Sequence, residues 1–304
     1  MSTNALVSII MPAYNRAWSI RRALDSVLAQ SYPHFEVVIT DDGSTDNTRE
    51  VVASYQDERI RYLKFDHNRG VVAARNNSIL AARGEWILFF DSDDELWPDC
   101  LQTFLDVATK VENKNYGIFF ANIIDSQTGE TKVNPFWRKK LSQNPVISYS
   151  DFLCNKSTGD FFPFLKRELF DTVPYVTKSR RNLHNFWHKM FRISDVIYVD
   201  KDVALCHTEG NDRITRNRAK DAPLWIEGIE EYLATFGEDI LASCPKQIAF
   251  HLKSLALYRY LAGERGKARK TLFQALRYDP LNISVWVYLA ASFVPSLFNK
   301  LANR

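Results

Sequence analysis

Four acidic residues follow a short apolar run in the first third of the chain. Asp91, Asp93, Asp94 and Glu95 come directly after the apolar segment 86–90. Because an unbroken apolar run of this length is typical of a strand buried on both faces, we expect the acids at the end of a buried strand. Carboxylates this close together repel one another unless a cation or hydrogen-bond donors neutralise them. The stretch therefore predicts either a cation and ligand site or a solvated acidic turn.

Polar turns also follow three strand-like segments upstream. Segment and turn occupy 6–11 and 12–16, 35–40 and 41–46, and 60–65 and 68–70. Apolar residues at helical spacing come after each turn, which predicts a doubly wound, mostly parallel α/β sheet flanked by helices. All four turns would then lie along one edge of the sheet, where open α/β sheets bind ligands. The chain has no GxGxxG or GxxxxGK[ST] motif, which excludes the usual dinucleotide fingerprint and the P-loop.

Composition indicates an ordinary globular protein: 304 residues, of which 46% are hydrophobic and 25% charged. The net charge of +3 gives no indication of nucleic-acid binding, but it is unevenly distributed. Residues 246–304 carry a net charge of +8, and residues 1–245 carry −5. A basic tail on an acidic body predicts an anionic surface as a partner.

The cysteines predict neither a zinc site nor a disulfide. Cys100, Cys154, Cys206 and Cys244 are far apart and form no CxxC pair. That pattern is typical of a reducing cytosol. The first residues also lack the charged start and long apolar core of a signal peptide, so we expect a cytoplasmic protein.

The polar turns belong to recognisable sequence motifs. These are Val7–Asn15, Asp41–Asp46, Asn68–Gly70, Ala74–Asn76 and Phe90–Asp94, in this order. On these motifs, residues 6–99 resemble the nucleotide-sugar half of family 2 glycosyltransferases. The resemblance implies a GT-A fold and transfer of a hexose or N-acetylhexosamine from a UDP-sugar donor to a saccharide or lipid-linked acceptor. It weakens after residue 125.

The resemblance implies roles for residues of the nucleotide-sugar site. Tyr14 offers a flat face on which a base can stack, beside Pro12, whose fixed φ shapes the turn. Asp42 corresponds to the family's acceptor for a uracil imide, and Arg75 either reaches the phosphates or pairs with a structural carboxylate. The full set expected to bind the donor is Pro12, Tyr14, Asn15, Asp42, Asn68, Gly70, Arg75, Asp91, Ser92, Asp93 and His207.

In this family the DxD motif holds Mg²⁺ or Mn²⁺ against the diphosphate, and Asp91-Ser92-Asp93 matches that motif. The resemblance implies Asp93 as the direct ligand, with Asp91 nearer the ribose. A divalent cation would stabilise the negative charge that develops on the departing UDP. Carboxylate oxygens are also the ligands that hard cations prefer.

The acceptor half departs from the family pattern. Family members invert the anomeric centre by direct displacement, and a carboxylate from a Glu-Asp pair takes the proton of the acceptor hydroxyl. Here the helix expected at 186–193 is preceded by Arg180–Asn185, which contains no acid. His184, whose ordinary pKa is near neutral, and Asp160 are the alternative candidates for the base. His207 lies where the family often has an Arg-x-His motif, and it could reach the phosphates or the metal.

The C-terminal third is helical, and residues 256–282 resemble one tetratricopeptide repeat. One repeat cannot bury its own apolar face, so it should pack on the catalytic domain, on another subunit or on a partner. Residues 281–298 hold no charge but include Pro295 and barely reach spanning length, which predicts an interfacial or packing helix. Two hypotheses follow for 246–304: contact with an anionic membrane, or a homo-oligomer formed through the C-terminal helices.

The predicted organisation is a GT-A domain at 1–222, with its nucleotide-sugar half at about 1–125 and its acceptor half at about 126–222, followed by a helical extension at 223–304. The predicted function is inverting, metal-dependent sugar transfer in surface polysaccharide or glycolipid synthesis. The protein would be cytoplasmic, either free or peripheral at the inner face of the membrane. The missing acid pair favours an alternative, a degenerate transferase that binds nucleotide without turnover. A haloacid-type phosphatase also has DxD after a strand, but usually has Thr or Val where Glu95 stands.

Overall fold

The computed structural model describes residues 4–111, 116–154, 160–175, 183–208 and 221–302. The chain divides into two compact units, here called the sheet unit and the helical unit. The sheet unit comprises Met1–Tyr149, Ser157–Val176 and Lys189–Gly210, and the helical unit comprises Ser150–Lys156, Thr177–His188 and Asn211–Arg304. The domain boundaries expected at 125 and 222 stay a prediction.

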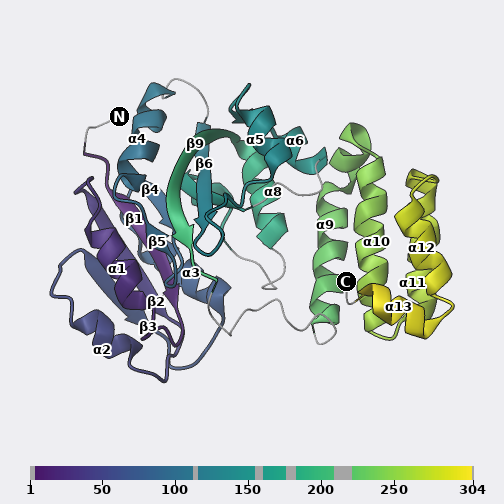
Figure 1. Ribbon diagram of the computed structural model, residues 1–304, viewed down its shortest axis with the longest axis horizontal. Coiled ribbons are helices and arrows are strands. Elements are labelled where there is room, and N and C mark those ends of the chain that lie inside the picture. The colour runs from purple at the N-terminus through teal and green to yellow at the C-terminus, as the bar shows by residue number, and fades with distance from the viewer. Residues whose placement is uncertain (1–3, 112–115, 155–159, 176–182, 209–220, 303–304) are drawn as a thin grey trace. The chain divides into compact units, whose positions relative to one another are not determined.

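The alternation of strand and helix over the first hundred residues is confirmed. The elements are β1 (Val7–Ala13), α1 (Ile20–Leu28), β2 (Phe35–Asp41), α2 (Thr48–Ala53), β3 (Ile60–Lys64), α3 (Val71–Ala81) and β4 (Trp86–Phe89). Strands β3, β2, β1 and β4 are parallel neighbours in this order (Figure 1). Their carboxyl ends, and the polar turns that follow them, therefore lie along one edge of the sheet.

The remaining strands extend the sheet with mixed directions. They are β5 (Glu95–Leu96), β6 (Tyr116–Asp125), β7 (Val146–Ile147), β8 (Phe161–Lys166) and β9 (Asp195–Cys206). The strand order is β3-β2-β1-β4-β8-β6-β9-β5, and β7 pairs with β9. Because β8 runs antiparallel to β4, β8 begins at the edge of the sheet where β4 ends.

Helices cover both faces of this sheet, which confirms the predicted α/β fold. On one face, Leu24 of α1, Val52 of α2 and Phe104 of α4 (Cys100–Lys110) share a core with alternate residues of the strands. On the other face, the Ser78 hydroxyl of α3 hydrogen-bonds the Thr40 hydroxyl of β2 at 2.7 Å. Two shorter helices complete the sheet unit, α5 (Pro135–Leu141) and α7 (Leu169–Thr172).

The last strand of the parallel group is fixed by stacked aromatic rings. Trp86 of β4 stacks on Phe164 of β8 with ring centroids 4.8 Å apart, and Phe164 stacks on Phe104 of α4 at 4.9 Å. All three side chains are almost fully buried. The strand that carries the acidic turn is therefore held by the largest apolar side chains of the core.

One buried carboxylate ties together the amino ends of three strands. Glu36 on β2 accepts hydrogen bonds from the Ser8 hydroxyl on β1 (2.7 Å), from Arg61 on β3 (2.8 Å) and from the Arg83 backbone N–H (2.6 Å). Burial raises the pKa of Glu36, but these three donors outweigh it and the net pKa is lowered.

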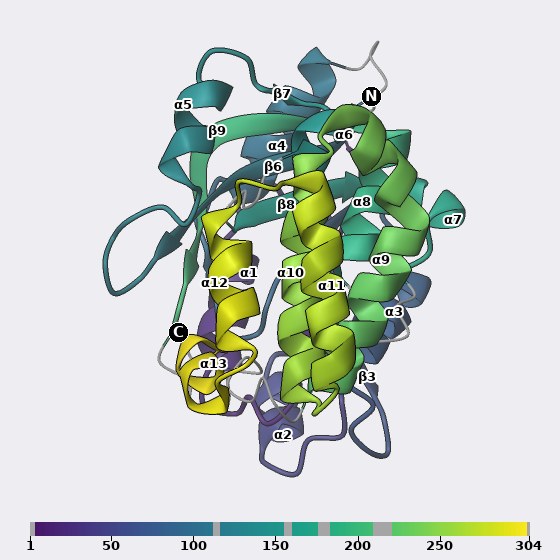
Figure 2. The same ribbon diagram turned by 90° about the vertical axis from the view of Figure 1, so that its right-hand side faces the viewer.

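The remaining helices are α6 (Tyr149–Cys154), α8 (Leu183–Ile193), α9 (Ala222–Ser243), α10 (Lys246–Leu261), α11 (Arg265–Tyr278), α12 (Ile283–Ala291) and α13 (Pro295–Ala302). Within the helical unit, α10, α11 and α12 lie side by side (Figure 2). Their shared core includes Ala256, Leu272, Val285 and Phe298. The helical C-terminal segment is thus confirmed, and none of the described helices is long and apolar enough to cross a bilayer.

The helical unit contains a disulfide that the sequence did not predict. Cys154 at the end of α6 is bonded to Cys244 after α9, with Cα atoms 5.5 Å apart and a sequence separation of 90. The cysteine spacing indicated no disulfide framework and did not reveal this bond, because spacing along the chain does not show which helix ends meet in space. The argument for a reducing compartment therefore loses its basis.

Replacing Glu36 with glutamine should change how stability depends on pH. Because the folded pKa of Glu36 lies below the unfolded value of about 4.3, its charge stabilises the fold above that pH. This contribution is lost as the pH falls through the folded pKa. We expect Glu36→Gln to lower the free energy of unfolding by about 1–3 kcal/mol at neutral pH. The difference from the wild type should become smaller as the pH falls into the acid range. Denaturant unfolding at stepped pH tests this, with exposed Glu58→Gln as control; a constant deficit would contradict it.

Replacing Gly43 with alanine should destabilise the turn after β2. Gly43 has φ +77°, and a Cβ there would lie 2.6 Å from the His67 carbonyl carbon. Gly129 is the matched control, because its φ is +70° but no atom lies within 4 Å of the added Cβ. In both variants, placing alanine in a left-handed backbone conformation costs about 1 kcal/mol. Only Gly43→Ala must also displace the backbone at His67. Thermal unfolding should therefore show a larger loss of Tm for Gly43→Ala, and equal losses would contradict close packing of the two turns.

Candidate functional site

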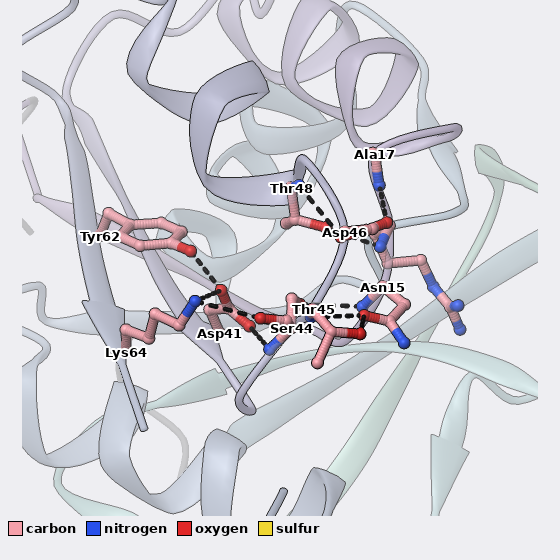
Figure 3. A network of polar contacts seen from close by, with 10 residues as sticks. Asn15, Ala17, Asp41, Ser44, Thr45, Asp46, Thr48, Tyr62 and Lys64 are labelled. Atoms are coloured by element: carbon pink, nitrogen blue, oxygen red, sulfur yellow. Dashed lines mark hydrogen bonds and ion pairs between the residues drawn. The ribbon is translucent and has the colours of Figure 1, made fainter. Parts of the chain in front are cut away.

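The turns after β1 and β2 are braced against each other (Figure 3). Asn15, with a left-handed φ of 52°, donates its backbone N–H to the Ser44 hydroxyl at 2.8 Å. Its side-chain oxygen accepts the Thr45 backbone N–H at 2.9 Å. The Asp46 carboxylate accepts the Ala17 backbone N–H at 3.0 Å. The two turns therefore form one fixed stretch of the sheet edge.

Asp41, at the end of β2, is a buried part of the same network. Its carboxylate accepts the Ser44 backbone N–H at 2.7 Å and the Tyr62 hydroxyl of β3, and it lies 3.7 Å from the Lys64 ammonium. Burial, together with the Asp41 hydrogen bond and charge, raises the pKa of Tyr62, so the hydroxyl stays a neutral donor. Asp41 thus joins β2 to β3, and it is fully buried among protein groups.

Asp42, expected to contact the base, holds the turn before α3. One of its carboxylate oxygens accepts the Arg69 backbone N–H at 2.6 Å, and the other accepts that of Gly70 at 2.7 Å. Gly70, also an expected site residue, has φ 95° and begins α3. Each oxygen of an ionised carboxylate has a second lone pair, so Asp42 can accept a further hydrogen bond while it fixes this turn.

Four further expected residues lie at strand ends or in the turns that follow them. Tyr14, directly after β1, is 41% exposed, so part of its side chain is accessible to a ligand. Pro12 is buried, and its carbonyl accepts the Ser92 hydroxyl at 2.9 Å. Asn68 is exposed in the connection between β3 and α3. Ser92 is buried as well, so its hydroxyl joins the acidic turn to β1 rather than facing solvent.

The acidic turn is partly neutralised by arginines from α3, α1 and the turn before it. Arg75 of α3 donates to the Asp91 carboxylate at 2.5 Å. The Arg16 guanidinium lies 3.6 Å from the Asp93 carboxylate, and Arg22 of α1 donates to the Asp93 carbonyl at 2.6 Å. Guanidinium groups that converge on the turn also offer hydrogen-bond donors suited to phosphate oxygens.

The third acid of the turn is buried. Burial, and next the charges of Asp91 and Asp93, raise the pKa of Asp94 to about 7. The His207 backbone N–H donates to the Asp94 carboxylate at 3.0 Å, and the His207 Nε2 atom lies 3.4 Å from the Glu95 carboxylate. The His207 Nδ1 atom is buried and has no hydrogen-bond partner among the described residues. The residue that follows β9 thus contacts the acidic turn.

Asp91 and Asp93 could hold a hard divalent cation. Their side chains stay 48% and 26% exposed, and both offer carboxylate oxygens. The described residues contain no group of three or more His, Cys, Asp or Glu side chains that could bind an ion by themselves. These residues fit an ion such as Mg²⁺, which takes one or two carboxylates and completes its shell with substrate phosphates and water.

Of the two candidate bases, Asp160 and His184, only Asp160 has a side chain among the described residues. Asp160 is exposed and precedes β8, and its backbone N–H donates to the Lys132 carbonyl at 3.2 Å. Because Leu88 pairs with Phe164 in antiparallel register, the start of β8 lies toward the end of β4 and the acidic turn. His184 belongs to α8, but its side chain lies outside the described residues.

The sequence did not predict which arginines support the acidic turn or which of its acids is buried. Arg16 and Arg22 contact Asp93, and Asp94 is the buried acid. The two arginines lie six residues apart around the start of α1, and this was the sequence pattern available to predict them. Apolar periodicity alone does not show which acids they contact.

Comparisons with known proteins agree with this geometry. A family profile described as "Glycosyl transferase family 2" matches residues 8–193. The chain is 28% identical, over 98% of its length and 96% of the relative's, to the GalNAc(5)-diNAcBac-PP-undecaprenol beta-1,3-glucosyltransferase of Campylobacter jejuni. It is 43% identical, over 71% of its length and 84% of the relative's, to the putative teichuronic acid biosynthesis glycosyltransferase TuaG of Bacillus subtilis.

A solved structure supports the fold. The S. aureus TarS chain crystallised with UDP-GlcNAc matches with a TM-score of 0.64 and 18% identity, covering 96% of this chain and 88% of that chain. The predicted GT-A type of fold is confirmed, and the phosphatase alternative has no support. The profile covers more than half of the chain and TuaG is matched over most of its length, so this protein is a glycosyltransferase and belongs to glycosyl transferase family 2.

Proposed function

We propose that this glycosyltransferase is inverting and dependent on a divalent cation. It would transfer a hexose or N-acetylhexosamine from a UDP-sugar to a saccharide or lipid-linked acceptor, in the synthesis of a surface polysaccharide or glycolipid. The observation that carries the proposal is that the acidic turn at 91–95 shares one sheet edge with the turns at 12–16, 41–46 and 68–70. The TarS complex supports UDP as the nucleotide, and the name of the Campylobacter relative supports a lipid-linked acceptor.

The donor's base and ribose would bind at the β1 and β2 ends. The exposed Tyr14 ring would stack on the base, and the spare lone pairs of Asp42 would accept its imide N–H. Asn15 and Ser92 are engaged with protein groups, so they would shape this site rather than bind the nucleotide directly.

The diphosphate would bind beside the acidic turn. Asp93 and Asp91 would hold Mn²⁺ or Mg²⁺, which supplies Lewis-acid stabilisation of the departing UDP when it is bound. Arg75 and Arg16 now face these two carboxylates. Once the carboxylates have another positive partner, both guanidinium groups can turn their donors to phosphate oxygens. The His207 Nδ1 atom, which has no hydrogen-bond partner in the described part of the chain, would be a further group available at this end of the site.

The acceptor hydroxyl must lose its proton as it displaces UDP from the anomeric carbon. We favour Asp160 as the base, because the antiparallel pairing of β8 with β4 brings its backbone toward the acidic turn. A carboxylate there would replace the acid that is missing from Arg180–Asn185. His184 is the second candidate.

A lipid-linked acceptor would bring the enzyme to a membrane surface. We propose a cytoplasmic protein that associates peripherally with the inner face of the cell membrane. The support is the net charge of +8 on residues 246–304, because the cytoplasmic leaflet is anionic and attracts basic segments. Self-association through the C-terminal helices is the competing proposal for the same segment.

The nucleotide site can be tested by thermal shift with UDP, GDP, TDP and CMP, each with and without Mn²⁺. We expect UDP with Mn²⁺ to stabilise the protein most, because a ligand at 100 times its Kd adds about 2.7 kcal/mol. Asp93→Ala should lose the Mn²⁺-dependent part of this shift and also the metal-dependent hydrolysis of UDP-sugar without acceptor. Asp106→Ala, which removes an exposed carboxylate on α4, should keep both.

No shift with any nucleotide would contradict the donor site. A full Mn²⁺-dependent response in Asp93→Ala would contradict its role as metal ligand. Binding without hydrolysis, or without transfer to any candidate acceptor, would favour the degenerate alternative.

The base can be tested by measuring UDP release from UDP-glucose with a diphosphoundecaprenol-linked sugar as acceptor. We expect Asp160→Asn to lower kcat by about 10²–10⁴-fold, which is the usual contribution of general base catalysis, with an unchanged UDP thermal shift. Asp171→Asn, which changes an exposed acid on α7, is the matched control. The same loss in His184→Gln, with Asp160→Asn active, would assign the base to His184. Full activity in both variants would exclude both candidates.

A further inference from the structure

Charge is segregated among the helices of the helical unit. Helix α9 carries five acidic and no basic residues, whereas α11 carries five basic and no acidic residues. Helix α12 carries no charge at all. Acidic charge is therefore concentrated in α9, and the basic helix α11 is followed in the sequence by the uncharged helix α12.

Helix α12 exposes an apolar stripe. Ile283 is 78% exposed, Trp286 51% and Val287 44%, at the i, i+3, i+4 spacing of one helix face. The opposite face is packed, because Val285 and Leu289 are buried in the core of the unit. The exposed side chains thus lie on a well-anchored helix.

The stripe continues past the end of α12. Phe293, Val294 and Leu297 are each about half exposed, and Leu281 before the helix is almost fully exposed. The Trp286 indole N–H donates to the Pro280 carbonyl at 2.8 Å, so its polar atom is satisfied while half of the side chain stays exposed. Exposed apolar side chains that follow one another along a helix and its flanks are typical of an interaction surface rather than of scattered surface apolar residues.

Basic side chains border this stripe. The Arg269 guanidinium of α11 lies 4.5 Å from the centre of the Phe293 ring and donates to the Ser292 carbonyl at 3.3 Å. Lys253 of α10 donates to the Ser284 hydroxyl at 3.1 Å. Lys270 and Arg277 of α11 are exposed on the same helix. Cations beside exposed aromatic and aliphatic side chains are the pattern of a helix that lies in a lipid interface.

We infer that this edge, formed by α11, α12 and the start of α13, is the surface that docks on an anionic lipid bilayer. Ile283, Trp286 and Phe293 enter the headgroup and acyl boundary, and the cations of α11 meet anionic headgroups. A second copy of the chain is disfavoured as the occupant, because a two-fold interface would place the same basic helix against itself. The biological purpose of this membrane docking rests on the lipid-linked acceptor proposed above. The charge and the exposed apolar side chains of the edge do not depend on the transfer reaction.

The test is co-sedimentation of the full chain with phosphatidylcholine vesicles, with and without phosphatidylglycerol. The wild type should bind the vesicles that contain phosphatidylglycerol, and high salt should weaken this binding. The double variant Ile283→Ser with Phe293→Ser should bind at least about tenfold more weakly, because two large apolar side chains no longer leave water. Lys270→Glu with Arg277→Glu should bind anionic vesicles more weakly and become less salt-sensitive.

The matched control is Leu224→Ser with Leu241→Ser, which removes two exposed leucines from the acidic helix α9. It should bind vesicles like the wild type. The UDP thermal shift should be equal in all variants, which separates failure of this surface from failure of the donor site and verifies folding.

Three outcomes would overturn the inference. They are no binding to anionic vesicles, equal binding to neutral vesicles, and unchanged binding by Ile283→Ser with Phe293→Ser. A wild type that is dimeric by light scattering, does not bind vesicles and becomes monomeric in that double variant would assign the edge to self-association instead.

Discussion

Repulsion among the carboxylates after β4 is the constraint on which the rest of the site depends. Three aspartates in four positions cannot all be ionised near one another without positive partners, and the fold brings these partners from the sequence before them. Arg16 and Arg22 come from around the start of α1, and Arg75 from α3. Asp94 is buried, and this burial together with the remaining repulsion raises its pKa. The turn is therefore held by guanidinium groups of the chain itself. In the proposed donor complex a metal ion would take over this neutralisation, so the carboxylates would have positive partners with and without the nucleotide.

The parallel order of β3, β2, β1 and β4 makes this neutralisation possible. It places the turns after four strands on one edge, and their polar side chains then bind the neighbouring turn instead of the solvent. Asp41, Asp42 and Asp46 mostly accept backbone N–H groups, so their role is to fix loop shape. A preorganised edge costs less to order when a ligand binds, because its loops are already braced. The same bracing leaves the Tyr14 ring 41% exposed at this edge, as the proposed stacking of a base requires.

Local pattern was enough to predict the strands, the helices and the four turns of the first hundred residues. Each of these depends on neighbours in the sequence: apolar runs, helical spacing and turn residues. The features that could not be predicted join distant parts of the chain. The disulfide joins Cys154 to Cys244, Arg22 reaches Asp93, and the Asp160 backbone approaches the acidic turn through the antiparallel pairing of β8 with β4. No periodicity reports such contacts, so the donor half was predictable in detail and the acceptor half was not.

The uneven charge of the chain now has a physical interpretation. Residues 1–245 are net negative, so an anionic donor would depend on the local arginines of the sheet edge and not on the overall charge of that part. Residues 246–304 are net positive and include the uncharged, partly exposed apolar helix α12. Long-range attraction to an anionic surface therefore acts on the C-terminal segment, whereas the arginines of the sheet edge act at short range. The five acidic residues of α9 sharpen this polarity, because they make that helix unfavourable for the same surface.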